Sequence, residues 1–274
     1  MKIKVRDVTV EYEDIGSGTP LLVLHSWFAN GRTEMPEYEP LFERRRGWRR
    51  IYPDVAAAAT PPLPAWMRGP DQVVDLLLEF MDTIAPGEPF AITGSSWGAY
   101  LAAAIVQRRV TQVVGVLFSV PALEYPASVR EVLARQVIRH DPAFDAALQP
   151  DEEWLRDYFV VQDLAALELS RNWPFPPPYS ADVLAFWGDK AFSFDPTVMP
   201  ETCRAPALFL AGRQDQIVGY RKVMSMLDHF PRATLAVLDR AGHLLEAEQP
   251  TLRTALVNEW LGRVEEYTTH NPRT

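Results

Sequence analysis

The chain has 274 residues, 47% of them hydrophobic, so it can bury a substantial core in one large domain or two small ones. Its formal net charge of −9 argues against a sequence-independent grip on nucleic acid, which requires clustered Lys and Arg facing phosphates. The lone cysteine, Cys203, cannot form an internal disulfide, as is usual for cytoplasmic proteins, and is expected to pack in the interior. We therefore expect a cytoplasmic protein.

The distribution of apolar residues along the chain argues against a membrane protein. Residues 1–6 alternate polar and apolar side chains, which is typical of a strand and not of a signal peptide. No apolar run approaches the roughly 18 to 20 residues that span a bilayer. The one basic cluster, at residues 44–50, is expected to be a solvated helix end, with a patch for an anionic partner as the alternative. The sequence does not indicate an oligomeric state.

Strand and helix patterns alternate along the first 120 residues. An edge hairpin at residues 2–18 feeds a buried strand at 21–24, and further strands are expected at 50–53, 90–93 and 113–119. Amphipathic or alanine-rich stretches predict helices at 37–45, at 71–84 and from residue 97 to about 107. This alternation predicts an α/β fold with a mostly parallel sheet covered by helices on both faces.

The alternation is interrupted between residues 121 and 202. Helices are expected there at 128–140 and 152–159, before a segment rich in proline and aromatic residues, and no buried strand is expected. The α/β pattern then resumes, with strands at 207–210 and 234–238, a helix at 221–229 and a final amphipathic helix from Leu252 to Val264. We expect an α/β core formed by residues 1–120 and 203–274, with a helical insertion at 121–202.

A serine lies in the pattern Gly-x-Ser-x-Gly at residues 94–98, between an expected strand and an expected helix. A serine on such a tight strand-to-helix turn needs glycines two residues before and after it, because the backbones approach closely there. Ser96 has Gly94 and Gly98 at these positions, whereas Ser95 has no glycines at this spacing. We predict that Ser96 is a catalytic nucleophile; the alternative is a tight turn with an inert serine.

A serine hydroxyl needs a base within hydrogen-bonding reach and an acid that orients the base. His243 follows the strand at 234–238 and is preceded by Gly242, and it is our candidate base, the alternative being a buried structural histidine. Asp215 follows the strand at 207–210, at the sheet edge where the Ser96 turn also opens, and is our candidate acid. Asp239 is the rival acid, although it lies very close to His243 in the sequence.

Hydrolysis of an acyl bond also needs an oxyanion hole, formed by two backbone N–H groups that face the developing negative charge. One donor is expected from Trp97, directly after the nucleophile and at the start of its helix. The second is expected from Trp27, in the loop after the strand at 21–24. His25 in the same loop is expected to shape it, with a role as a second base as the alternative.

These features together resemble the α/β-hydrolase superfamily over essentially the whole chain. The serine at position 96 resembles the esterase, lactonase and carbon–carbon-bond hydrolase branches, and not the dehalogenases or epoxide hydrolases, which use aspartate there. The strings at 47–54, 192–195, 212–215 and 238–243 resemble a bacterial group of such proteins with no settled substrate. The first and last strings are long enough to be specific.

The chain departs from the family pattern close to the site. Ser26 stands where members usually have glycine, and its side chain would narrow the oxyanion loop or add a hydroxyl donor to it. Ala99 replaces a second glycine of the elbow, and residues 55–59 replace a glycine-bearing loop.

The resemblance also implies that the insertion at 121–202 is a cap over the active site. Its aromatic residues either line an apolar pocket or form a small core of the cap itself, and the sequence does not choose between the two. These residues are Trp154, Tyr158, Phe159, Trp173, Phe175, Tyr179, Phe186 and Trp187.

The function expected from these residues is that of a serine hydrolase acting on a small, largely apolar ester, lactone or diketone-type substrate. No metal or organic cofactor is expected. A non-hydrolytic cyclase or lyase that uses His243 as acid and base is the alternative enzyme class. A binding protein built on the same fold is a third possibility, disfavoured because a binding protein has little need of the triad.

Overall fold

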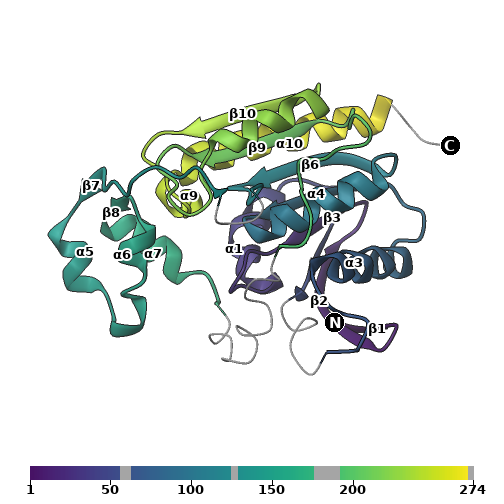
Figure 1. The fold of residues 1–274 in the computed structure, drawn as a ribbon, viewed down its shortest axis with the longest axis horizontal. Helices are drawn as coiled ribbons and strands as arrows, with labels where there is room; N and C mark the ends of the chain where they lie inside the picture. Colours follow the sequence, from purple (N-terminus) through teal and green to yellow (C-terminus); the bar gives the residue numbers. More distant parts are fainter. Residues whose placement is uncertain (56–62, 125–128, 176–191, 271–274) are drawn as a thin grey trace.

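The computed structural model describes residues 1–55, 63–124, 129–175 and 192–270. In these ranges eight strands form one sheet in the order β1-β2-β4-β3-β5-β6-β9-β10 (Figure 1). The β1–β2 and β2–β4 pairs are antiparallel and all the other pairs are parallel. The strands are β1 (Lys2–Val5), β2 (Val8–Gly16), β3 (Thr19–Leu24), β4 (Trp48–Pro53), β5 (Phe90–Ser95), β6 (Val113–Ser119), β9 (Ala207–Gly212) and β10 (Ala233–Leu238).

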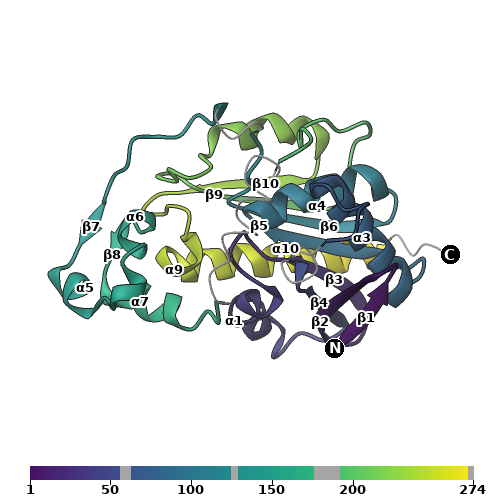
Figure 2. The same cartoon turned by 60° about the horizontal axis from the view of Figure 1, so that its bottom comes forward.

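Helices cover both faces of the sheet, which confirms the expected α/β fold (Figure 2). On one face α3 (Pro70–Ile84) packs against α4 (Trp97–Arg109), and on the other α1 (Gly31–Phe42) lies beside α10 (Pro250–His270). The central strands β3, β5, β6 and β9 are almost entirely buried between these layers, as their continuous apolar runs require. The carboxyl half also contains the short helices η4 (Arg221–His229) and α9 (Leu245–Glu248).

Helix α1 begins six residues earlier than expected. Asn30 caps it, because its side chain accepts hydrogen bonds from the N–H groups of Arg32 and Thr33, and the Thr33 hydroxyl accepts from the Asn30 N–H in return. Pro36 and Pro40 both lie inside the helix, where each removes one backbone hydrogen bond. The hydrogen bonds of Asn30 therefore set the start of the helix, and the two prolines further along do not interrupt it.

The basic cluster is only partly solvated. Arg44 and Arg46 are exposed, as expected of a helix end. Arg49 instead donates from Nε and Nη2 to the two carboxylate oxygens of Asp14, at 3.0 and 2.7 Å. Arg50 does the same with Glu39, at 3.1 and 2.6 Å, and is itself buried. Both of these residues are occupied within the chain, so the alternative of an anionic-partner patch gains no support from them.

The insertion forms a group of short elements beyond the end of the sheet at which β9 and β10 finish (Figure 1). The expected helix at 128–140 is wrong in the part that the structure describes, since residues 130–137 form no helix. The apolar side chains of Val132, Val137 and Ile138 are exposed there, and a helix of this length is marginal in water without a surface to pack on. The helix expected at 152–159 is divided in two. The described elements are β7 (Arg139–His140), α5 (Pro142–Ala147), η2 (Pro150–Glu152), α6 (Leu155–Tyr158), β8 (Val161–Gln162) and α7 (Leu164–Arg171).

The insertion has a small hydrophobic core of its own. Phe144, Leu155, Phe159 and Leu167 are all buried in it, and Ala247 of α9 closes it on the side of the main domain. Within the described ranges, no helix combines the length and hydrophobicity needed to cross a bilayer.

Candidate active site

Ser96 lies on a strained turn between β5 and α4. Its φ of 52° and ψ of −113° place it outside the regions that residues other than glycine normally occupy. A Cβ on Gly94 would lie 2.4 Å from the Gly98 backbone, and one on Gly98 would lie 2.2 Å from the Leu24 carbonyl oxygen. The Ser96 N–H donates to the Ser119 carbonyl at 2.9 Å, which fixes the turn to the end of β6. The spacing of glycines around Ser96 is thus a consequence of close backbone contacts.

The structure brings Ser96, His243 and Asp215 together although they are distant in sequence. His243 Nε2 lies 3.0 Å from Ser96 Oγ, and His243 Nδ1 lies 2.9 Å from Asp215 Oδ2. Asp215 is fully buried, and its Oδ1 accepts from the N–H groups of Ile217 and Val218 at 2.8 and 3.0 Å. These bonds hold the carboxylate in a fixed orientation toward the imidazole, the arrangement in which histidine acts as a general base.

The rival acid Asp239 does not face the histidine. Its Oδ1 accepts from Gln214 Nε2 at 2.7 Å on the far side of the turn. The main-chain N–H of Ala241 is bound by the same glutamine side chain, at 3.2 Å. Asp239 therefore contributes to the conformation of the His243 loop and not to the hydrogen-bonded chain itself.

Two opposing effects act on the imidazole of His243. Burial lowers its pKa, while the charge of Asp215 and the hydrogen bond to it raise the pKa, and the balance lies above the ordinary value of 6.5. The raised pKa means that the imidazole accepts a proton more readily than an isolated histidine, as a general base requires.

His25 has the surroundings of a structural residue. Its Nε2 accepts a hydrogen bond from the Val55 N–H at 3.0 Å, so Nδ1 carries the proton and donates to the Ser26 carbonyl at 2.8 Å. The ring is buried, and burial lowers its pKa. A neutral imidazole with both nitrogens engaged by backbone groups fits the expected role in shaping the loop.

The loop after β3 is tied down by a residue that the sequence did not single out. Glu34 of α1 is buried, and its Oε1 accepts from the Ser26 N–H at 3.3 Å. Burial, reinforced by the charge of Glu246, raises the pKa of Glu34 to about 8. The Ser26 carbonyl also accepts from the Ala29 N–H at 3.3 Å, which closes a turn in which Phe28 has a φ of 65°. Ser26 is thus engaged through its backbone on both sides.

Trp27 and Trp97, the expected oxyanion donors, are neighbours. Their rings meet edge to face with centroids 4.9 Å apart. Trp97 is the first residue of α4, where backbone N–H groups have no acceptor within the helix itself. The loop after β3 and the start of α4 are therefore in contact beside Ser96, as an oxyanion hole in this fold requires.

Glu248 of α9 connects the histidine loop to the insertion. Its Oε1 accepts from the N–H groups of Val160 and Val161 at 2.6 and 3.0 Å, and its Oε2 accepts from the Gly242 N–H at 2.5 Å. Burial raises the pKa of Glu248 to about 7, against the effect of these three hydrogen bonds. One buried carboxylate thus joins the residue before His243 to the β8 segment of the insertion.

The aromatic residues of the insertion divide between the two roles that the sequence left open. Phe159 is 1% exposed and belongs to the insertion's own core. Tyr158 instead faces the site, because its ring centroid lies 6.2 Å from that of His243. Trp154 contacts both Tyr158 and Phe175, and Trp173 packs at the edge of the small core. Tyr179, Phe186 and Trp187 lie outside the described residues, as do residues 56–59 of the loop that departs from the family pattern.

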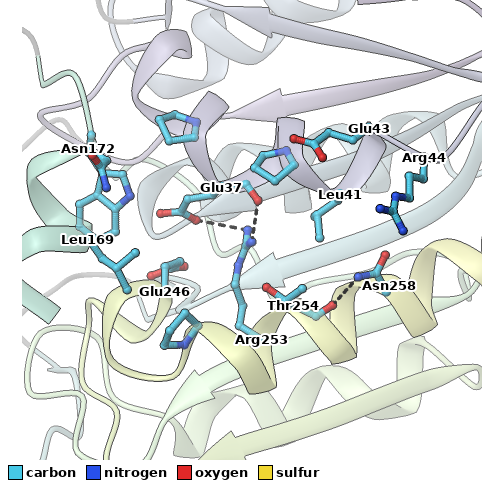
Figure 3. A pocket seen from close by; sticks show the side chains of 14 residues that line it. Glu37, Leu41, Glu43, Arg44, Leu169, Asn172, Glu246, Arg253, Thr254 and Asn258 are labelled. Carbon is cyan, nitrogen blue, oxygen red and sulfur yellow. Dashed lines mark hydrogen bonds and ion pairs between the residues drawn. The ribbon is translucent and has the colours of Figure 1, made fainter. Parts of the chain in front are cut away.

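A cavity of about 640 Å³ lies between α1, α7 and α10 (Figure 3). Arg253 projects into it from α10, and its Nη2 is 3.2 Å from a carboxylate oxygen of Glu37. Glu246 forms part of the wall, and its Oε1 accepts from the Ser119 hydroxyl at 2.6 Å. Since the Ser119 carbonyl accepts the Ser96 N–H, the Glu246–Ser119 pair lies between this cavity and the Ser96 turn.

The buried residues Glu34 and Glu248 and the half-buried Glu246 were not expected from the sequence. Glutamates at helix positions are usually solvated, and nothing in the local pattern distinguishes these three. In the ranges that the structure describes, no three His, Cys, Asp or Glu side chains are grouped so that they could hold a metal ion.

The sequence profile described as the alpha/beta hydrolase family matches residues 21–255. No curated protein matches the sequence significantly.

Solved structures show the same architecture. An alpha/beta superfamily hydrolase from Oenococcus oeni PSU-1 superposes with a TM-score of 0.82 at 23% identity, over 97% of this chain and 99% of that one. A thermophilic esterase from Thermogutta terrifontis gives a TM-score of 0.66 at 19% identity, over 96% and 98% of the two chains. A variant of the meta-cleavage product hydrolase CumD gives 0.61 at 22% identity, over 96% and 97%. At these identities the likeness is one of fold.

Proposed function

The chain belongs to the alpha/beta hydrolase family, and on this basis we propose that it is a serine hydrolase in which Ser96 is the nucleophile. The observation that carries the proposal is the hydrogen-bonded chain from Ser96 Oγ to His243 Nε2, at 3.0 Å, and from His243 Nδ1 to Asp215 Oδ2, at 2.9 Å. Hydrogen-bonding distances of this order are those required of a nucleophile, its base and the residue that orients the base.

In the proposed reaction Ser96 Oγ attacks the carbonyl carbon of the substrate while its proton passes to His243 Nε2. Asp215 holds the imidazole in the tautomer with the proton on Nδ1 and stabilises the imidazolium that forms. When the tetrahedral intermediate collapses, the leaving alcohol takes the proton from Nε2 and an acyl-enzyme remains. Water then attacks the acyl group with His243 again as the base, which releases the acid and restores Ser96.

The oxyanion would be stabilised by the backbone N–H groups of Trp27 and Trp97. Their contact beside Ser96 supports this assignment, and so does the position of Trp97 at the start of a helix, where the macrodipole favours negative charge. Loss of one such donor typically costs about 10²- to 10³-fold in kcat.

We assign the insertion at residues 121–202 the role of a cap. Tyr158 beside His243 and the Glu248 bonds to β8 support this role, since both place the described part of the insertion next to the catalytic histidine. The proposed substrates are small esters, lactones or diketones with an apolar part that the aromatic residues contact.

Labelling with a fluorophosphonate probe, followed by peptide mass spectrometry, tests the nucleophile. We expect an adduct on Ser96 that is absent in Ser96→Ala and weaker in His243→Ala. Ser95→Ala is the matched control, because Ser95 adjoins the nucleophile, and it should label like the natural protein. Folded protein that takes up no probe would contradict the proposal.

Turnover separates hydrolysis from the non-hydrolytic alternative. Ser96→Ala should lower kcat for a phenyl ester by about 10⁴- to 10⁶-fold. A substrate whose conversion survives Ser96→Ala but is lost in His243→Ala would instead identify a lyase or cyclase that uses the histidine alone.

A further inference from the structure

Arg130 lies near the start of the described range 129–175 of the insertion, and its guanidinium contacts the turn that follows β9. Its Nη1 is 3.5 Å from the Ile217 carbonyl oxygen, and its Cζ is 4.8 Å from the centroid of the Phe192 ring. Glu131, the residue after Arg130, packs closely against the same turn. Gly219 in that turn has a φ of 71°, and a Cβ there would lie 2.7 Å from the Glu131 carbonyl oxygen. The guanidinium is thus positioned from two sides.

Among the described residues, one edge of this guanidinium has no hydrogen-bond partner. The Nε and Nη2 atoms of Arg130 are both buried from solvent, and neither has a hydrogen-bond acceptor within the described ranges. Arginine remains charged at all physiological pH values, and a buried donor that lacks an acceptor is unfavourable. An acceptor that comes from outside the protein would remove this cost.

The same two atoms bind carboxylates elsewhere in this chain. Arg49 and Arg50 each donate from Nε and Nη2 to both oxygens of one carboxylate, Asp14 in the first case and Glu39 in the second, at 2.6 to 3.1 Å. This side-on, bidentate geometry matches two parallel N–H groups to two oxygens. At Arg130 the equivalent edge is present and shielded from water, but within the described residues no carboxylate occupies it.

The charge of Arg130 acts on the candidate triad. Burial, and to a smaller extent the charge of Arg130, lower the pKa of His243. Burial also lowers the pKa of Arg130 itself, against the charges of Glu124 and Asp215. The geometry agrees with these effects, because Ile217, whose carbonyl oxygen is 3.5 Å from Arg130 Nη1, donates its N–H to Asp215 Oδ1 at 2.8 Å.

We infer that the Nε–Nη2 edge of Arg130 binds a carboxylate of the substrate, so that the molecule attacked by Ser96 carries an anionic group besides its scissile bond. This inference rests on the proposed hydrolase function and narrows its substrate class from apolar esters to esters, lactones or ketones with a free carboxylate. Arg130 is then a specificity-determining residue on the insertion.

Two pairs of phenyl esters test the inference. In the first pair the carboxylate is on the acyl side, in phenyl hemiglutarate, and the control is its neutral methyl ester. In the second it is on the leaving group, in 4-acetoxybenzoate, again with the methyl ester as control. We expect kcat/KM of the natural protein to be at least about tenfold higher for the carboxylate in one of the pairs.

Arg130→Gln should lower kcat/KM for the preferred carboxylate by about 10- to 100-fold and change the neutral ester less than about threefold. Arg130→Lys should fall between the two, since it keeps the charge but not the planar fork. Arg221→Gln is the matched control, because Arg221 is exposed and its Nη1 lies 3.4 Å from Glu131 of the same segment. It should leave both esters unchanged.

Equal losses for the charged and neutral esters in Arg130→Gln would overturn the inference and indicate a structural role. Absence of a preference in both pairs of the natural protein would overturn it too.

A binding measurement separates this inference from the proposed hydrolysis. Ser96→Ala is titrated by calorimetry with phenyl hemiglutarate and with 4-acetoxybenzoate, and for at least one of them the Kd should become about tenfold or more weaker once Arg130→Gln is added. Binding that depends on Arg130 in a protein that hydrolyses none of the esters would refute the hydrolase and support the anion site. Hydrolysis together with binding that does not depend on Arg130 would support the hydrolase and refute the anion site.

Discussion

The sheet and the insertion both lie beside the candidate site, but they are built differently. Strands β5 and β9 are almost wholly buried, and the turns after them carry Ser96 and Asp215. The described insertion consists of helices and strands of two to eight residues, and apolar side chains such as Leu164, 42% exposed, lie on its surface. Rigid elements position reacting groups more accurately than loosely packed ones.

The difference suggests that the two regions have separate roles, one in bond cleavage and one in substrate binding. The groups proposed for bond cleavage come from the part of the chain with the most buried contacts. The groups proposed to meet the rest of the substrate, Arg130 and Tyr158, come from the part with the fewest. Substrate preference can therefore change through the insertion while the reacting atoms stay in place.

The largest effect on kcat should come from Asp215, on the turn that follows strand β9 of the sheet. Asp215→Asn should lower kcat by about 10³- to 10⁴-fold, because the amide cannot stabilise the imidazolium and favours the wrong tautomer of His243. Steady-state kinetics with the preferred phenyl ester measure this. Asp239→Asn is the control and should change kcat less than about twofold. A comparable loss in both variants would mean that the turn, and not the carboxylate, is what matters.

Removing one phenylalanine from each core should show whether the two regions unfold together. Phe209→Ala in β9 should lower the global free energy of unfolding by about 3 to 5 kcal/mol. Phe159→Ala in the insertion core should instead raise hydrogen exchange mainly at residues 139–171 and leave the global unfolding transition nearly in place. Exchange mass spectrometry with a urea titration distinguishes these cases. If Phe159→Ala lowered global stability as much as Phe209→Ala, the insertion and sheet would form one cooperative unit.

The pH dependence of kcat/KM should show an electrostatic effect of the insertion on His243. His243 must be neutral to accept the serine proton, and its pKa lies above 6.5, so activity should fall as the pH drops through that raised value. The charge of Arg130 lowers this pKa, so Arg130→Gln should move the acid limb to higher pH when a neutral ester is used. An unchanged acid limb would show that the insertion has no electrostatic effect on the base.

The smallest effect concerns Glu34, which binds the Ser26 N–H. Because its pKa is raised to about 8, it is mostly protonated at pH 7, and Glu34→Gln should keep kcat within about twofold. Glu34→Leu lacks the acceptor and should lower kcat more. Between the ordinary pKa of glutamate and about 8, the folded protein keeps a proton that the unfolded chain has lost, so its stability falls as pH rises. The Tm of Glu34→Gln relative to the natural protein should therefore rise from pH 5 to pH 8, and a constant difference would contradict the burial argument.

The sequence predicted the sheet well because its central strands are buried on both faces. Such strands are continuous apolar runs, like residues 21–24 and 207–210, and they leave a strong local pattern. Gly94 and Gly98 were informative for a related reason: each marks a backbone contact too close for a Cβ. The positions of Ser96, Asp215 and His243 at the ends of strands followed from these signals.

The remaining features depend on contacts between distant parts of the chain. The insertion's helix at 128–140 was expected from local composition, but the described residues 130–137 are not helical and the apolar side chains of this segment are exposed instead of packed. Glu34 and Glu248 look like ordinary surface glutamates until α1 and α9 are placed against the backbone groups that they bind. Arg130 carries no local signal either, because its importance lies in which of its nitrogens have acceptors.

The three hydrogen bonds accepted by Glu248 have a practical consequence for protein engineering. A transplant of the insertion onto another scaffold, cut at the loops that flank it, would separate Val160 and Val161 from the carboxylate that holds them. In this chain the same carboxylate also accepts from the Gly242 N–H, so it holds the insertion and the loop before His243 together. A functional graft therefore has to carry α9 with it, although that helix begins more than eighty residues after Val161 in the chain.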